Sequence, residues 1–494
     1  MNILLVSPAH PDTYWSFKHA LKFIAKKANN PPLGLMTVAA MLPSGWEKKL
    51  VDLNIRPLNE EELIWADLVF VGAMSVQEKS ATDVIQRCHR LHKKTIVGGP
   101  LFTGDPHRWA AMVDHMVLNE AEITLPQFLR DLEQGTPKKI YKTAVYADMQ
   151  DSPTPDYSLI DASDYGQLNI QYSRGCPYDC EFCEITALLG RKVRVKSPGQ
   201  IIDELEAIYQ TGFRGNVFFV DDNFIGNRKK LKKELLPAIA GWNKIHRYPF
   251  SFTTEASINL ADDPELLKQV ACAGFNRVFV GIESPNKESL VECDKKLNAE
   301  RDLIQSVRII QSAGIEVTAG FIVGFDSDTT SIFQEQVEFI QESGIMTAMV
   351  GLLNAPERTR LYKRLEEEGR ILSIYDGNNT NFEMNFVPKM DKKTLLSGYR
   401  SILTGIYSCK AYHLRLMAFL KEFRPVAQFG RRINLDSIRA LLRAIYYLGI
   451  RSYGRIYFWR LFLWSLFKRP QLLPLAITHS VYGYHFRKVY QINR

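Results

Sequence analysis

Three cysteines within eight residues constrain this chain more than any other feature. Cys176, Cys180 and Cys183 have the spacing Cys-x3-Cys-x2-Cys, and no fourth Cys or His lies close to them in the sequence. A closed structural zinc site needs four ligands, usually arranged as two pairs. A fully ligated [4Fe–4S] cluster needs four thiolates. Three thiolates would leave one iron open to a ligand that is not protein, so the spacing predicts a catalytic cluster rather than an electron-transfer centre.

The run from Ser173 to Cys183 resembles the signature of the radical SAM enzymes, in which an aromatic residue precedes the last cysteine. In that family the amino and carboxylate groups of S-adenosylmethionine chelate the open iron. The resemblance implies that Phe182 packs near the adenine of this ligand. A partial zinc knuckle, or three unrelated thiols, is the alternative. The remaining cysteines are scattered singly and are interpreted as buried packing residues: Cys88, Cys272, Cys293 and Cys409.

Length and composition indicate a multidomain protein of a reducing compartment. A chain of 494 residues exceeds what one hydrophobic core supports. We predict domains at 1–145, 166–370 and 371–494, with a linker at 146–165 that contains Pro153 and Pro155. Seven cysteines without paired spacing argue against a disulfide scaffold, and the first residues lack a basic signal-peptide region. The predicted location is cytoplasmic.

The first 145 residues alternate short apolar strands with helices, a pattern that predicts a doubly wound parallel sheet. The expected strands are 2–6, 49–53, 68–73, 95–97 and 115–118. Ligands of such sheets bind at the carboxyl ends of the strands. Small or polar residues stand at these ends and are the candidate ligand contacts: Ser7, Ser75, Gly98, Gly99 and Glu120. No Gly-x-Gly-x-x-Gly follows the first strand, which disfavours a dinucleotide.

This region resembles the flavodoxin-like cobalamin-binding domain that precedes the barrel in one radical SAM subgroup. The resemblance covers the helix start at 31–35, the Gly98-Gly99-Pro100 turn and the segment with Glu120 and Glu122. The Asp-x-His-x-x-Gly motif, whose His binds cobalt in classical methyltransferases, is absent from the sequence. The resemblance therefore implies bound cobalamin without a protein His on the metal, with His10 as an alternative axial ligand.

A second alternating series predicts a partial (β/α)6 TIM barrel, with strands at 168–173, 217–221, 250–255, 277–283, 316–323 and 347–352. Functional residues of barrels gather at the carboxyl ends of the strands. The radical SAM resemblance implies that Glu283 contacts the ribose of S-adenosylmethionine and that Asp222 and Glu255 face its methionine or the substrate. It also places one glycine-containing strand against the adenine: Gly320, Ile322 and Gly324. The alternative for each acid is a helix cap or a loop salt bridge.

The C-terminal extension, 371–494, is predicted to be mostly helical and is strongly basic. From Lys389 onward the chain has 20 Lys or Arg and three acids, which is a net charge of +17. Because the whole chain has a net charge of +8, residues 1–388 have a net charge of −9. Interleaved aromatic residues favour peripheral contact with a membrane surface over nucleic acid. Its longest apolar stretch is shorter than the roughly 20 residues of a membrane span. A basic helical cap packed on its own protein is the alternative.

The whole chain resembles cobalamin-binding radical SAM proteins similar to hopanoid C-2 methylases, also through residues 221–227 and 482–486. The resemblance implies three cofactors, a [4Fe–4S] cluster, S-adenosylmethionine and cobalamin, and an external electron donor of flavodoxin or ferredoxin type. It implies C-methylation of an unactivated carbon in a small-molecule or lipid-like substrate, through a 5′-deoxyadenosyl radical and methylcobalamin. A cyclase or rearrangement enzyme without methyl transfer is the alternative. Methylthiotransfer to tRNA is disfavoured because no Cys precedes Cys88.

A non-enzymatic alternative is a metal-stabilised binding protein that associates with a membrane. The missing fourth metal ligand argues against it.

Overall fold

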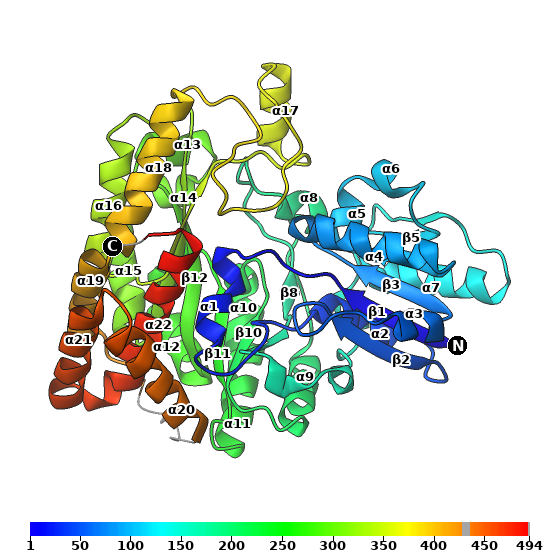
Figure 1. Ribbon diagram of the computed structural model, residues 1–494, viewed down its shortest axis with the longest axis horizontal. Coiled ribbons are helices and arrows are strands. Elements are labelled where there is room, and N and C mark those ends of the chain that lie inside the picture. Colours follow the sequence, from blue (N-terminus) through cyan, green and yellow to red (C-terminus); the bar gives the residue numbers. More distant parts are fainter. Residues whose placement is uncertain (427–434, 493–494) are drawn as a thin grey trace.

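The N-terminal region is a parallel sheet covered by helices on both faces, as the alternating pattern predicts. The computed structural model describes residues 1–426 and 435–492 and shows this sheet beside a barrel and a helical C-terminal region (Figure 1). Its six strands run in the order β2-β1-β3-β4-β5-β6, all parallel. Their bounds are β1 Asn2–Ser7, β2 Glu47–Asp52, β3 Leu68–Gly72, β4 Lys94–Gly98, β5 His115–Val117 and β6 Ile140–Tyr141.

Side-chain alternation along these strands explains the two helical layers. Ile3 and Leu5 of β1 pack with helices α2 (Leu33–Met41) and α7 (Ala121–Glu133), whereas Leu4 and Val6 pack with α4 (Glu78–Arg90) on the other face. Both faces of a parallel sheet must be covered because its strands are apolar on both sides. The sixth strand, β6, was not predicted, since two residues carry no periodicity.

The second sheet is an open barrel of six parallel strands. It runs in chain order, with β7 and β14 as its edges. The strands are β7 Leu168–Ile170, β10 Asn216–Phe219, β11 Ser251–Glu255, β12 Phe275–Glu283, β13 Glu316–Val323 and β14 Ala348–Leu352. The outer helices include α9 Pro198–Gln210, α11 Leu236–Ile245, α12 Pro264–Ala273, α15 Leu303–Ser312 and α16 Ile332–Ser343. This arrangement confirms the predicted (β/α)6 architecture.

One predicted strand has a different form in the structure. The prediction of a continuous strand over 168–173 is wrong, because β7 ends at Ile170 and the chain turns away from the sheet. Ser173–Arg174 instead form β8, which pairs antiparallel with β9 (Arg194–Val195). The three cysteines lie between the two arms of this β8–β9 hairpin.

The open side of the barrel, between β7 and β14, is covered by the loop that follows β1. In this loop the buried Tyr14 stacks on Phe486 with 4.3 Å between ring centroids, and its hydroxyl lies 3.1 Å from that of Tyr407. Helix α1 (Lys18–Leu21) packs on α22 (Leu473–Val489), and the two lie side by side in Figure 1. The N-terminal domain and the C-terminal helices therefore complete the barrel together.

The C-terminal extension is helical, as predicted, and much of it belongs to the barrel core. Its helices are α18 Lys392–Tyr407, α19 Cys409–Glu422, α20 Leu435–Ala444, α21 Arg455–Lys468 and α22. Phe486 of α22 and Tyr399 of α18 are fully buried in the same hydrophobic cluster as the barrel strands. No helix in the described part of the chain is long and apolar enough to cross a bilayer.

Two ion pairs join the N-terminal domain to the β8–β9 hairpin. Arg174 binds both carboxylate oxygens of Glu122 at 2.8 and 3.0 Å, and Arg194 binds both of Glu120 at 2.7 and 2.8 Å. The four side chains are at most 14% exposed. Planar two-point pairing of this kind fixes orientation as well as distance. We call these four residues the interdomain ion pairs.

We expect Glu122→Gln to lower the free energy of unfolding by about 3 kcal/mol, because it leaves the largely buried Arg174 with only a longer, 3.9 Å contact to the Glu120 carboxylate. Urea denaturation of the cofactor-free protein measures the change. The matched control is Glu342→Gln, which breaks a pair with side chains 60% and 49% exposed and should cost less than about 1 kcal/mol. Equal effects of the two substitutions would contradict a structural role for the interdomain ion pairs.

Candidate functional site

The cysteine loop is a tight turn that keeps three free thiols close together. Cys176, Cys180 and Cys183 are half-buried, and none forms a disulfide. The Cys183 N–H donates to the Cys180 carbonyl at 3.1 Å, and the Cys176 N–H to that of Gly190 at 3.2 Å. Gly175 has φ +91°, and a Cβ there would lie 2.7 Å from the Lys192 carbonyl, so this turn requires glycine.

The arrangement of the thiols suits a cluster better than a single ion. Burial, reinforced by the neighbouring thiols, raises the pKa of Cys183 to about 12. Within the described residues, no three His, Cys, Asp or Glu side chains converge closely enough to hold one metal ion. A [4Fe–4S] cluster needs no such convergence, because its cysteines bind different iron atoms.

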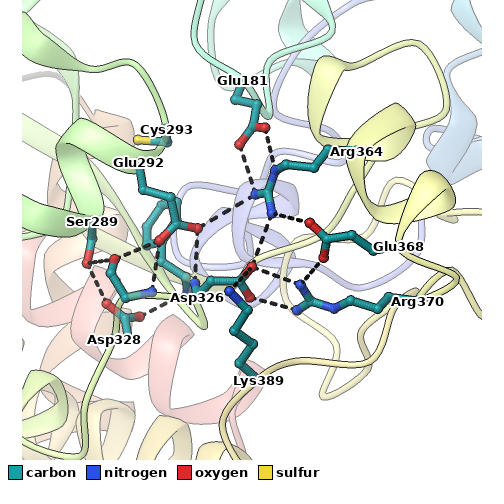
Figure 2. Close-up of polar contacts among 12 residues, drawn as sticks. Glu181, Ser289, Glu292, Cys293, Asp326, Asp328, Arg364, Glu368, Arg370 and Lys389 are labelled. Atoms are coloured by element: carbon teal, nitrogen blue, oxygen red, sulfur yellow. Dashed lines mark hydrogen bonds and ion pairs between the residues drawn. The ribbon is translucent and has the colours of Figure 1, made fainter.

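A second set of ion pairs holds the cysteine loop from its other side (Figure 2). Glu181, between Cys180 and Phe182, accepts bonds of 2.7 and 3.1 Å from Arg364 of α17 (Arg360–Glu367). Arg364 also bonds to Asp326, which follows β13 and binds Arg370 at 2.7 Å. Burial alone would raise the pKa of Asp326, but Arg370 and Arg364 lower it to about 2.

Asp221 and Asp222, which follow β10, have different surroundings. Asp221 accepts hydrogen bonds from the Tyr172 N–H and from the N–H and hydroxyl of Ser173, so it fixes the start of the β8–β9 hairpin. Burial raises the pKa of Asp222 to about 6. Its buried Oδ2 has no hydrogen-bond partner among the described residues. A buried unpaired carboxylate oxygen beside the cysteine loop fits a ligand that brings a hydrogen-bond donor or a positive charge.

Glu255, at the end of β11, is a carboxyl group that stays protonated near neutral pH. Burial, and then the charges of Asp222 and Asp221, raise its pKa to about 8. Its side chain lines the large cavity described below. In its neutral form it can donate a hydrogen bond into that cavity.

Glu283 ends β12 in an uncommon backbone conformation. Its φ is +69°, a region that costs a non-glycine residue energy unless the surroundings hold it there. Its carboxylate is buried and paired with Lys295, which is the loop salt bridge considered above as an alternative. The charges of Glu283 and Lys295 both act on the Cys180 thiol, so the pair lies close to the cysteine loop.

Of the predicted adenine-binding residues, Gly320 and Ile322 lie within β13, and Gly324 directly follows it. Phe182 packs edge-on against Phe325, the residue that follows Gly324, with 6.5 Å between ring centroids. Gly324 has φ +108°, which explains a glycine at this position. A Cβ on Gly320 would lie 2.9 Å from the Phe279 ring. The glycine at this position therefore makes room for an aromatic side chain of the protein itself.

A cavity of 2920 Å³ extends from the carboxyl edge of the N-terminal sheet into the barrel, as far as Asn216 and Glu316 at the amino ends of β10 and β13. Its lining includes four of the five candidate contacts in the N-terminal domain: Ser7, Gly98, Gly99 and Glu120. Ser75 is not part of the lining and lies against Gly377 instead, although its neighbours Met74 and Val76 face the cavity. The Glu120 carboxylate is engaged by Arg194, and His10 also lines the cavity.

Several residues that shape the site were not predicted. Arg174 and Arg194 pair with acids 52 and 74 residues away, and Lys295 and Arg364 pair with residues of other loops. Trp15 reaches the barrel from the N-terminal domain. No local motif marks such residues, because their partners are set by the tertiary fold.

Comparisons with known proteins agree with this geometry. The model for the B12 binding domain matches residues 25–129, that for the Radical SAM superfamily matches 170–340, and a domain of unknown function, DUF4070, matches 359–494. An uncharacterized methyltransferase of Synechocystis sp. is 38% identical over 100% of this chain and 93% of the relative. The hopanoid C-2 methylase of Rhodopseudomonas palustris is 34% identical over 98% of this chain and 93% of the relative.

Solved structures share the fold. The cobalamin-dependent S-adenosylmethionine radical enzyme OxsB, with aqua-cobalamin and S-adenosylmethionine bound, superposes with a TM-score of 0.65 at 16% identity, over 99% of this chain and 79% of that one. The radical S-adenosylmethionine methyltransferase TsrM of Kitasatospora setae, with cobalamin and a [4Fe–4S] cluster, gives 0.62 at 15% identity, over 92% and 97%.

The raised pKa of Glu255 predicts a pH dependence of stability. Its value of about 8 in the folded state, against an ordinary 4.5, means that the folded protein binds this proton more tightly than the unfolded chain. The associated stability is fully present below pH 4.5 and is lost as pH rises towards 8. The free energy of unfolding of cofactor-free Glu255→Gln should therefore fall less between pH 5.5 and 8.5 than that of the wild type. Glu342→Gln should keep the wild-type pH dependence of the free energy of unfolding. The wild-type pH dependence in Glu255→Gln would contradict the raised pKa of Glu255.

The matched relatives span nearly the whole chain, and residues that flank the cysteine loop line one cavity with the cobalamin-type sheet edge. These residues fit the cofactors of the matched families, a [4Fe–4S] cluster, S-adenosylmethionine and cobalamin. The chain belongs to the cobalamin-dependent radical SAM methyltransferase family.

Proposed function

We propose that this protein methylates an unactivated carbon of a lipid-like substrate. The observation that carries the proposal is the shared cavity. Arg174 and Ile185, which flank the cysteine loop on its two sides, line it, and the cobalamin-type sheet borders it through Gly98 and Gly99. Two cofactors at one shared cavity can act on the same substrate carbon and limit its contact with bulk water. The hopanoid C-2 methylase among the relatives supports a lipid-like substrate.

We assign Cys176, Cys180 and Cys183 to three irons of the cluster. When bound, the cofactors supply radical hydrogen abstraction and a transferable methyl group, and the protein supplies binding and shielding. S-adenosylmethionine would be bound by residues of the barrel strands and the cysteine loop: Phe182, Asp222, Glu255, Glu283, Gly320, Ile322 and Gly324. Cobalamin would lie against the N-terminal domain at Ser7, Gly98, Gly99 and the segment around Ser75 and Glu120. An external electron donor of flavodoxin or ferredoxin type would reduce the cluster.

The domain limits that we propose are 1–145, 166–370 and 371–494. The location is proposed as cytoplasmic, with peripheral contact at the inner face of the membrane.

Anaerobic reconstitution tests the proposed reaction. The protein is loaded with iron, sulfide and hydroxocobalamin, and then receives dithionite and methyl-labelled S-adenosylmethionine. We expect 5′-deoxyadenosine together with labelled methyl on the cobalamin. Formation of 5′-deoxyadenosine without label on the cobalamin would instead support a cyclase, a class that also occurs among the relatives, at 24% identity.

Cysteine substitutions test the cluster assignment separately. We expect Cys180→Ala to lose most of the bound iron and at least 100-fold of the 5′-deoxyadenosine formation, because two thiolates cannot hold the cluster. Cys272→Ala is the matched control, since this thiol lies outside the cysteine loop and is exposed, contrary to the expectation that it is buried. Wild-type rates of cleavage in Cys180→Ala would overturn the assignment.

Membrane contact is supported by an exposed patch on the C-terminal helices. Tyr453 is 94% exposed, Phe467 76% and Ile456 60%, and exposed Arg451, Arg455, Arg460 and Lys468 surround them. Large apolar side chains next to cations fit the interface of an anionic bilayer. We call these seven residues the C-terminal patch.

Co-sedimentation with vesicles tests the C-terminal patch. Replacing Tyr453, Ile456 and Phe467 by Ser should reduce binding to phosphatidylglycerol vesicles roughly tenfold, and the wild type should bind phosphatidylcholine vesicles weakly. The control replaces Leu372 and Ile374, exposed residues far from the patch in sequence, by Ser. Point substitutions are preferable to deletion because α22 is part of the barrel core. Unchanged sedimentation of the triple variant would exclude the patch as the contact surface.

A further inference from the structure

The lumen of the barrel is open along the length of its strands. In closed (β/α)8 barrels the interior is filled by layers of bulky branched side chains. Here the lining of the large cavity includes both ends of the same strand, Ser251 and Glu255 of β11. It also includes Arg277 and Glu316, at the amino ends of β12 and β13. The cavity therefore continues from the site of the cofactors into the barrel.

Small and polar side chains keep the lumen open. Side chains alternate along a strand, so every second residue points inward. On β11 the inward series is Ser251, Thr253 and Glu255, and on β13 it is Glu316, Thr318 and Gly320. None of these six residues is the large aliphatic type that fills closed barrels. The sequence of the strands, and not only their number, leaves this space.

Aromatic side chains line the middle of the lumen, at the level of Glu255 and Thr318 on the neighbouring strands. Trp15, from the loop after β1, meets Phe279 of β12 edge-on, with 5.4 Å between ring centroids. Its Nε1–H lies 3.1 Å from the sulfur of Met349 on β14. Trp15 and Phe279 both line the cavity. A ligand in the middle of the lumen would thus contact aromatic and thioether surface.

The amino end of the lumen is polar, and its main ion pair is internally balanced. Arg277 lines the cavity and is held by Glu316, with 3.1 Å between Nε and Oε2. His479 lies 3.4 Å from the other carboxylate oxygen of Glu316. Because the Arg277 and Glu316 charges cancel, a neutral hydrogen-bonding group can contact Arg277 without leaving a buried charge uncompensated. Thr253, which is paired with Arg277 across β11 and β12, lines the cavity at the same level.

The distance between the two ends sets the size of the occupant. Arg277 and Glu283 are six residues apart on β12, which corresponds to about 20 Å along a strand. A ligand that reaches from the cofactors to Arg277 must be elongated, apolar in its middle and polar at its far end.

We propose that the amino end of the barrel lumen, formed by Arg277, Glu316 and Thr253, binds the uncharged, hydroxyl-bearing end of an elongated and otherwise apolar substrate. The reactive carbon at the opposite end would then lie near Glu283 and the cysteine loop. This inference rests on the proposed function and adds to it the polarity, length and orientation of the substrate.

Direct binding of chosen probes tests this inference without turnover. The cobalamin-loaded, cluster-reconstituted protein is dialysed at fixed detergent concentration against a radiolabelled triterpenoid alcohol, its parent hydrocarbon and the matching carboxylic acid. We expect the alcohol to bind at least tenfold more tightly than the other two. Thr318→Phe, which fills the lumen, should weaken alcohol binding at least tenfold. Arg277→Lys, which keeps the charge beside Glu316 but not the guanidinium geometry, should reduce the preference for the alcohol several-fold.

Thr404→Phe, the same substitution at an exposed position of α18, should bind the alcohol like the wild type. The iron and cobalamin contents of each variant show whether it has folded. Equal binding of alcohol and hydrocarbon, tighter binding of the acid, or wild-type binding by a folded Thr318→Phe would each overturn the inference. If the wild type binds the alcohol but its cobalamin never receives the labelled methyl group of S-adenosylmethionine, the proposed function is wrong and the lumen site is still supported.

Discussion

The position of the cysteine loop depends on buried ion pairs that hold it from two sides. On one side Arg174 and Arg194 connect the β8–β9 hairpin to Glu122 and Glu120 of the N-terminal domain. On the other, Arg364 connects Glu181 to the loop after β13. Burying such charges costs free energy that only good pairing geometry recovers, so each pair holds one arrangement of its elements. The relative placement of the two cofactor-binding regions follows from these contacts.

The open barrel has a second consequence for function. Six strands cannot close on themselves in the way that eight do, and the free side is covered by residues from both ends of the chain, Tyr14 and Phe486 among them. The N-terminal domain thereby contributes Trp15 to the barrel interior as well as a sheet edge to the cavity. The loop that follows β1 therefore connects the proposed cofactor site with the proposed substrate site.

The sequence predicted the parts of this structure that local patterns encode. Buried apolar runs such as 316–323 identified the barrel strands, and the spacing of three cysteines identified the functional loop after the first of these strands. Elements of two residues, such as β8 and β9, have no periodicity to detect. The partner of Glu120 could not be predicted either, because Arg194 is 74 residues away. Glu283 was predicted at its strand end, but its pairing with Lys295 depends on a loop conformation that propensity does not determine.

The central claim is that three cysteines hold a cluster whose fourth iron binds S-adenosylmethionine inside a cavity shared with cobalamin. Electron paramagnetic resonance of the dithionite-reduced, cobalamin-loaded protein tests it most directly. The account predicts that adding S-adenosylmethionine changes the g values of the reduced [4Fe–4S] cluster, because the ligand coordinates its open iron. A cluster signal that stays the same at saturating S-adenosylmethionine would contradict it.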